Sequence, residues 1–257
     1  MKFALISNTK TEAMKGLRGV CPNCGSELIA KCGEIKVNHW AHKGTRNCDI
    51  WWENETHWHR AWKDHFPKEW QEVVHVADDG EKHIADVKTE NGWVIEFQHS
   101  FLKNKERKSR DSFYPKLVWV VDGLRRKKDI NQFQKIFEES DTVNRHPTIE
   151  RVRYIEECKL LDEWSNSSSM VFFDFHDKDS ELWFILPEMQ KIGCFLMFLT
   201  KNEFIELHKT CGFEKFYTEQ IQQLRNFLII QNQKNRSTNI PRAYLTNREL
   251  RYRNKRF

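Results

Sequence analysis

The stretch "HIADVKTENGWVIEFQHS", residues 83–100, decides the fold that we expect for this chain. Two segments in which apolar and polar residues alternate flank an Asn-Gly pair, a pattern typical of a β-hairpin. However, Asp86, Glu96, Gln98 and His99 lie among the apolar positions. Strand residues this close to a tight turn ordinarily serve packing, so the acids and the amide indicate a functional role.

The number of residues in the turn determines whether the two acids share a face. A two-residue loop at the Asn-Gly pair puts Asp86 and Glu96 on opposite faces of the hairpin. A three-residue loop that ends at Gly92, with Gly92 at positive φ, pairs the two acids directly. We predict the three-residue loop, with Ile95 and Phe97 buried on the other face. Two carboxylates this close repel unless a cation lies between them, and they suit a hard ion such as Mg²⁺ or Mn²⁺.

The segment before the hairpin has the periodicity of a helix over residues 54–66, ended by the proline that follows. Its tryptophans form an apolar stripe, and Glu55, His59 and Lys63 recur every four residues beside that stripe. Residues at this spacing lie in one row on a helix surface. We therefore expect this row to face the acids of the hairpin.

The order of the central elements predicts a mixed sheet. A helix is followed by three strands, a second helix and a fourth strand, which is a nearly unbroken apolar run typical of a strand buried on both faces. The third strand, the second helix and the fourth strand can form a crossover between parallel strands. The predicted elements span, in chain order, residues 54–66, 70–78, 82–89, 93–100, 101–113 and 116–123.

Composition divides the chain into three parts. Residues 1–50 are rich in turns and contain four of the seven cysteines. A serine-rich segment at 164–169 precedes a change of composition, so we place a boundary there. The prediction is an N-terminal module over residues 1–50, a core over 51–165 and a C-terminal α+β extension over 166–257.

A metal site is the best use of the N-terminal cysteines. Cys21-Pro-Asn-Cys24-Gly is typical of a zinc knuckle, whose tight turn brings two thiolates to one ion. His39 and His42 follow at a distance that suits a second ligand pair. We predict a structural Zn²⁺ held by these four residues, with two competing ligands, Cys32 and Cys48.

The bulk composition sets limits on location and partners. The 42 basic and 37 acidic residues give a net charge of +5, which does not by itself indicate nucleic acid. No run of about 18 apolar residues predicts a membrane span, and the N-terminus lacks the apolar core of a secretory signal. We therefore expect a cytoplasmic protein without a membrane partner. In such a reducing compartment, an odd count of seven cysteines favours metal ligation over a disulfide framework.

Six segments together resemble the competence-protein CoiA-like nucleases, a branch of the PD-(D/E)xK restriction-endonuclease-like superfamily. They are "CPNCG", "HWAH", "ENETHWHRAWK", "KHIADV", "VIEFQHS" and "RKSRDSFY", in this order over about residues 20–122. The resemblance implies an α/β (α+β) fold with an αβββαβ core and a mixed sheet, preceded by a zinc-ribbon-like module. It also implies a divalent-metal-dependent deoxyribonuclease that uses Mg²⁺ or Mn²⁺ and acts on DNA.

The same resemblance assigns roles to individual residues. Asp86 matches the acid of the second strand, while Glu96 and Gln98 match the (D/E)-x-K pair. Gln98 therefore stands where the family carries Lys, which removes a cation that would position or deprotonate the attacking water. The other implied site residues are Glu55, His59 and Lys63 on the first helix and Arg107, Arg110 and Tyr114 on the second. The two arginines would hold phosphates.

Two other functions stay open at this point. Gln98 supports a zinc-ribbon DNA-binding protein whose nuclease-like core is inactive. Several histidines between residues 39 and 59, together with Asn54, suggest an HNH-type nuclease, but that assignment leaves Asp86 and Glu96 without a role. A cleavage assay with a divalent metal separates the enzyme from the binding protein.

Overall fold

The computed structural model describes residues 1–44, 48–51, 55–145, 147–176, 181–186 and 194–237. The contacts among residues form two units, Met1–Phe213 and Glu214–Phe257. The described part of the second unit belongs to helix α6 (Phe213–Ser237). None of the described helices combines the length and the apolar character that crossing a bilayer requires. The first unit holds two β-sheets and every residue discussed below.

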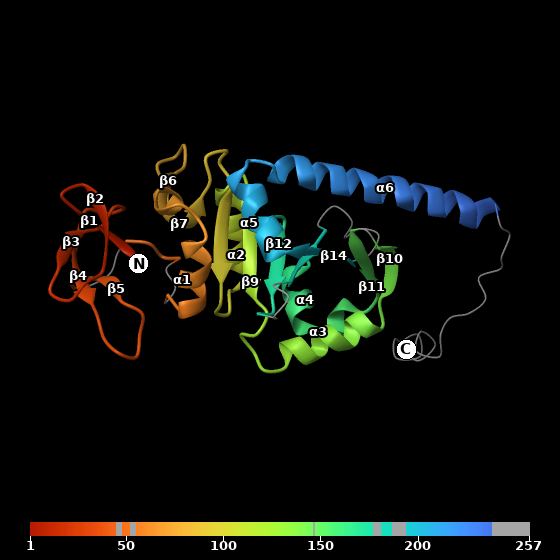
Figure 1. Cartoon of the computed structure of the whole chain (residues 1–257), viewed down its shortest axis with the longest axis horizontal. Helices are drawn as coiled ribbons and strands as arrows, with labels where there is room; N and C mark the ends of the chain where they lie inside the picture. The colour runs from red at the N-terminus through yellow and green to blue at the C-terminus, as the bar shows by residue number, and fades with distance from the viewer. Residues whose placement is uncertain (45–47, 52–54, 146, 177–180, 187–193, 238–257) are drawn as a thin grey trace. The chain divides into compact units, whose positions relative to one another are not determined.

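The first sheet is small, antiparallel and N-terminal (Figure 1). Its strands lie in the order β2-β1-β3-β4-β5. Ala4, Leu28 and Trp40 are almost completely buried in its core. The strands are β1 (Phe3–Ile6), β2 (Thr9–Glu12), β3 (Arg18–Val20), β4 (Glu27–Lys31) and β5 (His39–His42).

The second sheet has nine strands and is mixed, as the sequence predicts. Its order is β10-β11-β14-β13-β12-β9-β8-β7-β6, and β8, β9 and β12 are parallel neighbours. The strands are β6 (Gln71–Val76), β7 (Lys82–Lys88), β8 (Val94–Gln98), β9 (Leu117–Asp122), β10 (Asp141–Arg145), β11 (Thr148–Val152), β12 (Met170–Asp174), β13 (Glu181–Ile185) and β14 (Cys194–Thr200). The helices of this unit are α1 (His57–Asp64), α2 (Asn104–Phe113), α3 (Asp129–Glu138), α4 (Lys159–Trp164) and α5 (Lys201–Lys209), with 3-10 turns at Lys68–Trp70 and Ile155–Glu157.

The predicted order of helix, three strands, helix and strand is present as α1-β6-β7-β8-α2-β9. Helix α1 begins at His57 because Thr56 caps it: the Thr56 hydroxyl accepts a hydrogen bond from the backbone N–H of His59. The helix ends before Pro67, which cannot continue it. Residues 52–54, which include the predicted start of this helix, lie outside the described residues.

The large sheet extends past residue 165, where the sequence analysis places a boundary. Strand β12 pairs in parallel with β9, and β13 and β14 continue the sheet to β11. The described residues of β12 and β14 are nearly all buried. Strands of this kind require neighbours at both edges and cover on both faces, so the segment completes the core sheet. The contacts divide the chain after Phe213 instead.

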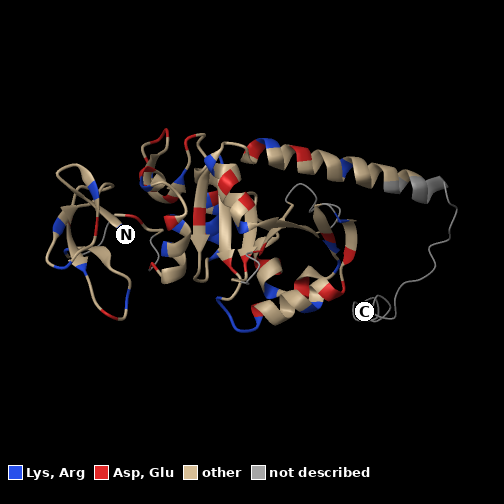
Figure 2. Cartoon of the chain, viewed as in Figure 1, with Lys and Arg blue, Asp and Glu red and all other residues tan. Residues whose placement is uncertain are grey.

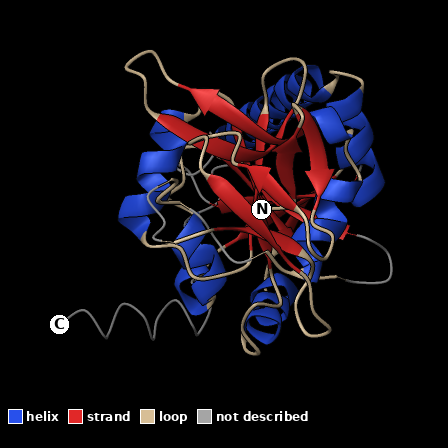
Figure 3. Ribbon diagram, turned by 90° about the vertical axis from the view of Figure 1, so that its left-hand side faces the viewer, coloured by secondary structure: helices blue, strands red, loops and turns tan. Residues whose placement is uncertain are grey.

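Helices cover both faces of the large sheet (Figure 3). On one face, Trp62 of α1 stacks on Phe97 of β8, and Phe204 of α5 packs on Phe172 of β12. On the other face, α2, α3 and α4 contribute to an apolar cluster around Trp119 of β9. The sheet is therefore the middle layer of the unit, and α1 is fixed over β8 by its tryptophans.

The hairpin formed by β7 and β8 has the predicted loop. Val87 lies opposite Ile95, and the backbone N–H of Thr89 donates to the carbonyl of Trp93. Three residues therefore form the loop, and the last of them, Gly92, has a φ of +84°. Both the loop length and the positive φ confirm the prediction from the Asn-Gly pair.

Replacing Gly92 by Val should destabilise the fold by roughly 1–2 kcal/mol, because a β-branched residue is poorly tolerated at positive φ. Gly33→Val is the matched control, since Gly33 is exposed, has no heavy atom within 4 Å of an added Cβ and lacks a positive φ. Urea unfolding measures both variants. Equal losses of stability in the two would contradict a constraint that is specific to the hairpin turn.

Candidate functional site

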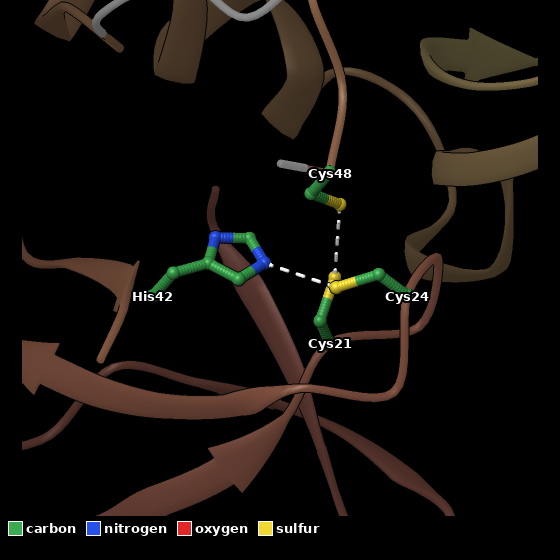
Figure 4. Close-up of side chains that lie close together, drawn as sticks. All are labelled: Cys21, Cys24, His42 and Cys48. Atoms are coloured by element: carbon green, nitrogen blue, oxygen red, sulfur yellow. Dashed lines mark hydrogen bonds between the residues drawn. The ribbon is translucent and has the colours of Figure 1, made fainter. Parts of the chain in front are cut away.

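Three cysteines and one histidine converge in the N-terminal region (Figure 4). The ligand atoms of Cys21, Cys24, His42 and Cys48 all lie within 4.8 Å of one another. Sγ of Cys24 is 3.3 Å from Nε2 of His42, and Sγ of Cys21 is 3.5 Å from Sγ of Cys48. Three thiols and one imidazole can hold a metal ion, and this set of donors suits tetrahedral Zn²⁺.

The structure corrects the predicted ligand set at one position. Cys48, which the sequence offered as a competing ligand, takes the place assigned to His39. His39 and His42 lie three residues apart on β5, so their side chains leave opposite faces of the strand. Nδ1 of His39 lies 2.9 Å from a carbonyl oxygen two residues earlier. Cys32, the other competitor, donates its thiol to the carbonyl of Ala13.

The thiols of this cluster differ in how readily they ionise. Burial acts to raise the pKa of Cys24, but hydrogen bonds from Ser26 and His42 outweigh burial and bring the pKa to about 6. Burial raises the pKa of Cys48 to about 12. Because zinc binds thiolates, loading of zinc at this cluster would release protons, and the affinity for zinc would rise with the pH.

A second group of polar side chains lines a cavity of about 80 Å³, which is room for a hydrated cation. His42 and Cys48 line this cavity as well, so it borders the thiol cluster. The charged and polar side chains that line it, apart from His42 and Cys48, are Asp49, Glu55, His59, Lys63, Glu72, Asp86, Glu96 and Arg110. Asp49 and Glu55 lie before α1, and the others come from α1, β6, β7, β8 and α2. We call this space the acid cavity.

Three acids of the acid cavity lie in one row across β6, β7 and β8. The register of β6 and β7 places Glu72 opposite Asp86, and the register of β7 and β8 places Asp86 opposite Glu96. Carboxylates replace part of the backbone ladder here. The N–H of Asp86 donates to Oε1 of Glu96 at 3.3 Å, and the N–H of Phe97 donates to Oδ2 of Asp86 at 3.0 Å. The two hairpin acids therefore lie side by side, while Ile95 and Phe97 are buried.

Lys63 is a buried cation among these acids. The residue is only 2% exposed, and its Nζ lies 2.7 Å from Glu55, 3.0 Å from Glu72 and 3.8 Å from Asp86. Burial acts against the charge of Lys63, but Glu72 and Glu55 keep its pKa above the ordinary value. Burial acts to raise the pKa of Glu55, but Lys63 and Arg60 bring it to about 2. Glu55, which lies just before α1, and Lys63 on α1 thus form a charged pair that reaches Asp86 of the hairpin.

The negative charge of Glu96 is balanced less fully by neighbouring cations than that of Glu55. Burial and the neighbouring Asp86 raise the pKa of Glu96 to about 8, although Nη1 of Arg110 lies 3.3 Å away. Tyr114 lies nearby, and burial followed by the charge of Glu96 raises the pKa of its hydroxyl, which has no hydrogen-bond partner among the described residues. A raised carboxyl pKa beside a second carboxylate indicates a position that a cation would stabilise.

Two predicted site residues point elsewhere. The amide of Gln98 donates to oxygens of Ser100, and the guanidinium of Arg107 donates to the carbonyl of Glu163 and lies over the ring of Trp164. Neither these two residues nor Tyr114 is among the described residues that line the acid cavity. Arg107 is 3% exposed because α2 packs against α4 on that side, so its placement gives no support to a phosphate contact.

Sequence reasoning missed two acids that organise the site. Glu72, the second residue of β6, has a φ of +47° and accepts hydrogen bonds from the backbone N–H groups of Lys2 and Phe3. Asp49 accepts a hydrogen bond from the N–H of Ile84, at the start of β7. The only local signal for Glu72 is a pair of polar residues at the start of an otherwise apolar strand. Asp49 has no local signal, because its partner is 35 residues away.

The geometry defines a class of protein: a mixed α/β protein with a Cys₃His cluster that can hold a metal ion, beside an acidic cavity. Residues 5–51, which include all four cluster residues, match the family described as competence protein CoiA, N-terminal domain. Over 57 residues the chain is 39% identical to the competence protein CoiA of Bacillus subtilis (strain 168). That segment covers 22% of this chain and 15% of the length of the relative. No solved structure matches the chain. These matches support a relationship to CoiA proteins.

Cys48→Ser should remove the bound metal and lower the unfolding temperature, because it deletes one of four ligands. The matched control is Cys32→Ser, which removes a cysteine of the same region that does not belong to the cluster. Metal analysis of purified protein should give about one Zn²⁺ per chain for the wild type and the control. Loss of zinc in Cys32→Ser, or in a parallel His39→Gln variant, would refute the cluster as the zinc site.

Glu96 should make the chain less stable as the pH rises, when no divalent cation is added. Between the ordinary carboxyl pKa of about 4.3 and the folded value of about 8, the folded chain holds a proton that the unfolded chain has lost. The free energy of unfolding therefore falls across this window, and Glu96→Gln should flatten the fall. Urea unfolding at pH 6 and pH 8 tests this, with the exposed turn residue Glu90→Gln as control. The same slope in all three proteins would contradict the raised pKa.

Proposed function

We propose that this chain is a divalent-metal-dependent deoxyribonuclease and that α1-β6-β7-β8-α2-β9 is a restriction-endonuclease-like core. The observation that carries the proposal is the pair of carboxylates on β7 and β8, Asp86 and Glu96, side by side in a cavity large enough for a hydrated cation. The resemblance of the six sequence segments favours DNA as the substrate.

Asp86 and Glu96 would hold Mg²⁺ or Mn²⁺ in this proposal. The fit rests on the donor set, because hard cations prefer carboxylate oxygens, and on the raised pKa of Glu96, which indicates too little positive charge nearby. When bound, such a cation orients water and neutralises charge that builds on a phosphodiester. Glu55 and Glu72, which also line the cavity, would serve as further acids of the site.

Lys63 would supply the cation that Gln98 does not. Its ammonium lies 3.8 Å from Asp86, whereas the Gln98 amide is directed at Ser100. The ammonium is fixed by Glu55 and Glu72, so it can hold a phosphate oxygen or a water beside Asp86 without reorganisation. Arg110 would stabilise charge from the side of Glu96.

A DNA-binding protein with an inactive core is the second candidate. The observation that favours it is the pairing of the cavity acids with protein cations. Lys63 contacts Glu55, Glu72 and Asp86, and Arg110 contacts Glu96. An HNH-type nuclease is less consistent with the structure. The thiol cluster offers four protein ligands and thus no open metal position, which is typical of a structural site.

Asp86→Asn and Glu96→Gln should each reduce DNA cleavage by at least 100-fold, roughly the contribution of one electrostatic catalytic group. Neither change should unfold the chain, because each also relieves repulsion between the acids. The assay uses purified zinc-loaded protein, single-stranded, duplex and branched DNA, and Mg²⁺ or Mn²⁺. Glu90→Gln, an exposed acid in the same hairpin, is the control.

Full cleavage by both acid variants would overturn the nuclease assignment for this cavity. Tight DNA binding without cleavage of any substrate, in either metal, would favour the binding protein instead.

A further inference from the structure

A second polar cluster lies at the carboxyl ends of the three parallel strands. His99 follows β8, Asp122 ends β9 and His176 lies two residues beyond β12. Nδ1 of His99 is 2.5 Å from one oxygen of Asp122, and Nε2 of His176 is 3.0 Å from the other. The carboxyl ends of parallel strands are where open α/β sheets commonly bind ligands.

One buried carboxylate thus orients two accessible imidazoles. Asp122 is 2% exposed, and it also accepts a hydrogen bond from the N–H of Leu124 at 2.8 Å. The side chains of His99 and His176 are 40% and 34% exposed. Because each ring donates to Asp122 through one nitrogen, its second nitrogen lies on the opposite edge of the ring. The cluster therefore presents two imidazole edges that can meet a ligand from solvent.

The surroundings fix this arrangement. The ring of Trp58 on α1 stacks on His176, with the centroids 6.0 Å apart, and its Nε1 donates to Asp174 at 2.9 Å. Lys201 of α5 lies 3.7 Å from Asp174. The hydrogen bond with Asp122 raises the pKa of His176, against the effect of its partial burial. The charged and titratable groups that face the two imidazoles are Asp122, Asp174, Lys201 and His59.

The cluster suits an anion better than a metal ion. In the part of the chain that the structure describes, only the Cys21 group brings three or more ligand atoms within 4.8 Å of one another. The loop between β9 and α3, residues 125–128, is basic throughout (Figure 2). Arg125 donates to the carbonyl of Ser100, which ties the loop to the residue after His99, while Glu163 pairs with both Arg125 and Arg126. Lys127 and Lys128 are exposed, so they are the cations of this loop that can attract an anion.

His59 places the cluster next to the acid cavity. Its ring lines the cavity and lies 6.0 Å, centroid to centroid, from the ring of His99. We propose that His99 and His176 form an anion subsite for a backbone phosphate of DNA. In this arrangement, a neighbouring phosphate of the same strand lies at the acid cavity. This inference rests on the proposed nuclease function. Each imidazole, when protonated, donates a hydrogen bond to a phosphate oxygen through the nitrogen that Asp122 does not engage.

The test is binding of a fluorescent single-stranded DNA oligonucleotide without added divalent cation, measured between pH 6 and pH 8. Wild-type affinity should fall as the pH rises, because the imidazoles lose their protons. His99→Gln and His176→Gln should each weaken binding about tenfold at pH 6, reduce its pH dependence and lower the salt slope by about 0.7. His65→Gln, an exposed histidine at the end of α1, should bind like the wild type.

A measurement on the unaltered chain guards against misfolded variants. In protein labelled with ¹⁵N-histidine, the oligonucleotide should raise the pKa of two imidazoles, and each variant should lack one of these signals. Titration with inorganic phosphate is the second arm. If inorganic phosphate, at the same concentration as the oligonucleotide, changes the two imidazole signals in the same way, the cluster is a site for free phosphate. That result would overturn its assignment to DNA.

The two proposals fail in different ways. In one outcome, the protein cleaves DNA with a divalent metal, but its DNA binding does not depend on pH and neither histidine variant alters it. This would overturn the subsite and leave the nuclease in place. Binding that depends on both histidines, with no cleavage in any metal, would support the subsite as a DNA contact and contradict the nuclease.

Discussion

The buried ammonium of Lys63 is the interaction on which the arrangement of the site depends. A buried charge without partners costs several kcal/mol, so its neighbours must supply oxygens. They come from the segment before α1, from β6 and from β7, through Glu55, Glu72 and Asp86. One cation therefore brings three separate parts of the chain to a single point, and Asp86 of the hairpin is held within its reach.

Glu72 connects this point to the N-terminal sheet. Its carboxylate accepts the backbone N–H groups of Lys2 and Phe3 while it also contacts Lys63. A second connection runs through Asp49, which follows the cluster residue Cys48 directly and bonds the N–H of Ile84. Glu72 thus joins the acid cavity to the N-terminal sheet, and Asp49 joins it to the thiol cluster, which explains why His42 and Cys48 also line the cavity.

Local patterns predicted the parts of the structure that local chemistry determines. The Asn-Gly pair indicated a tight turn, and the pairing of the two acids selected the three-residue loop with Gly92 at positive φ. The spacing of four predicted that Lys63, on α1, and Glu55, just before it, meet the hairpin. Partners distant in sequence left no such pattern. Cys48 replaced His39 because strand alternation, not spacing along the chain, decides which side chains converge. The neighbours of β12 and the burial of Arg107 depend on tertiary packing, which composition does not encode.

The strand order of the large sheet has a consequence for how the chain folds. β10 and β11 precede β12, yet they join the sheet through β14, which is made some 40 residues later. During synthesis the β10–β11 hairpin must therefore wait, unattached at one edge, until β12, β13 and β14 have filled the gap next to β9. Contacts of this long range are slow to form, and an exposed strand edge invites pairing with other chains. Truncation before β14 should thus leave an aggregation-prone intermediate rather than a smaller stable domain.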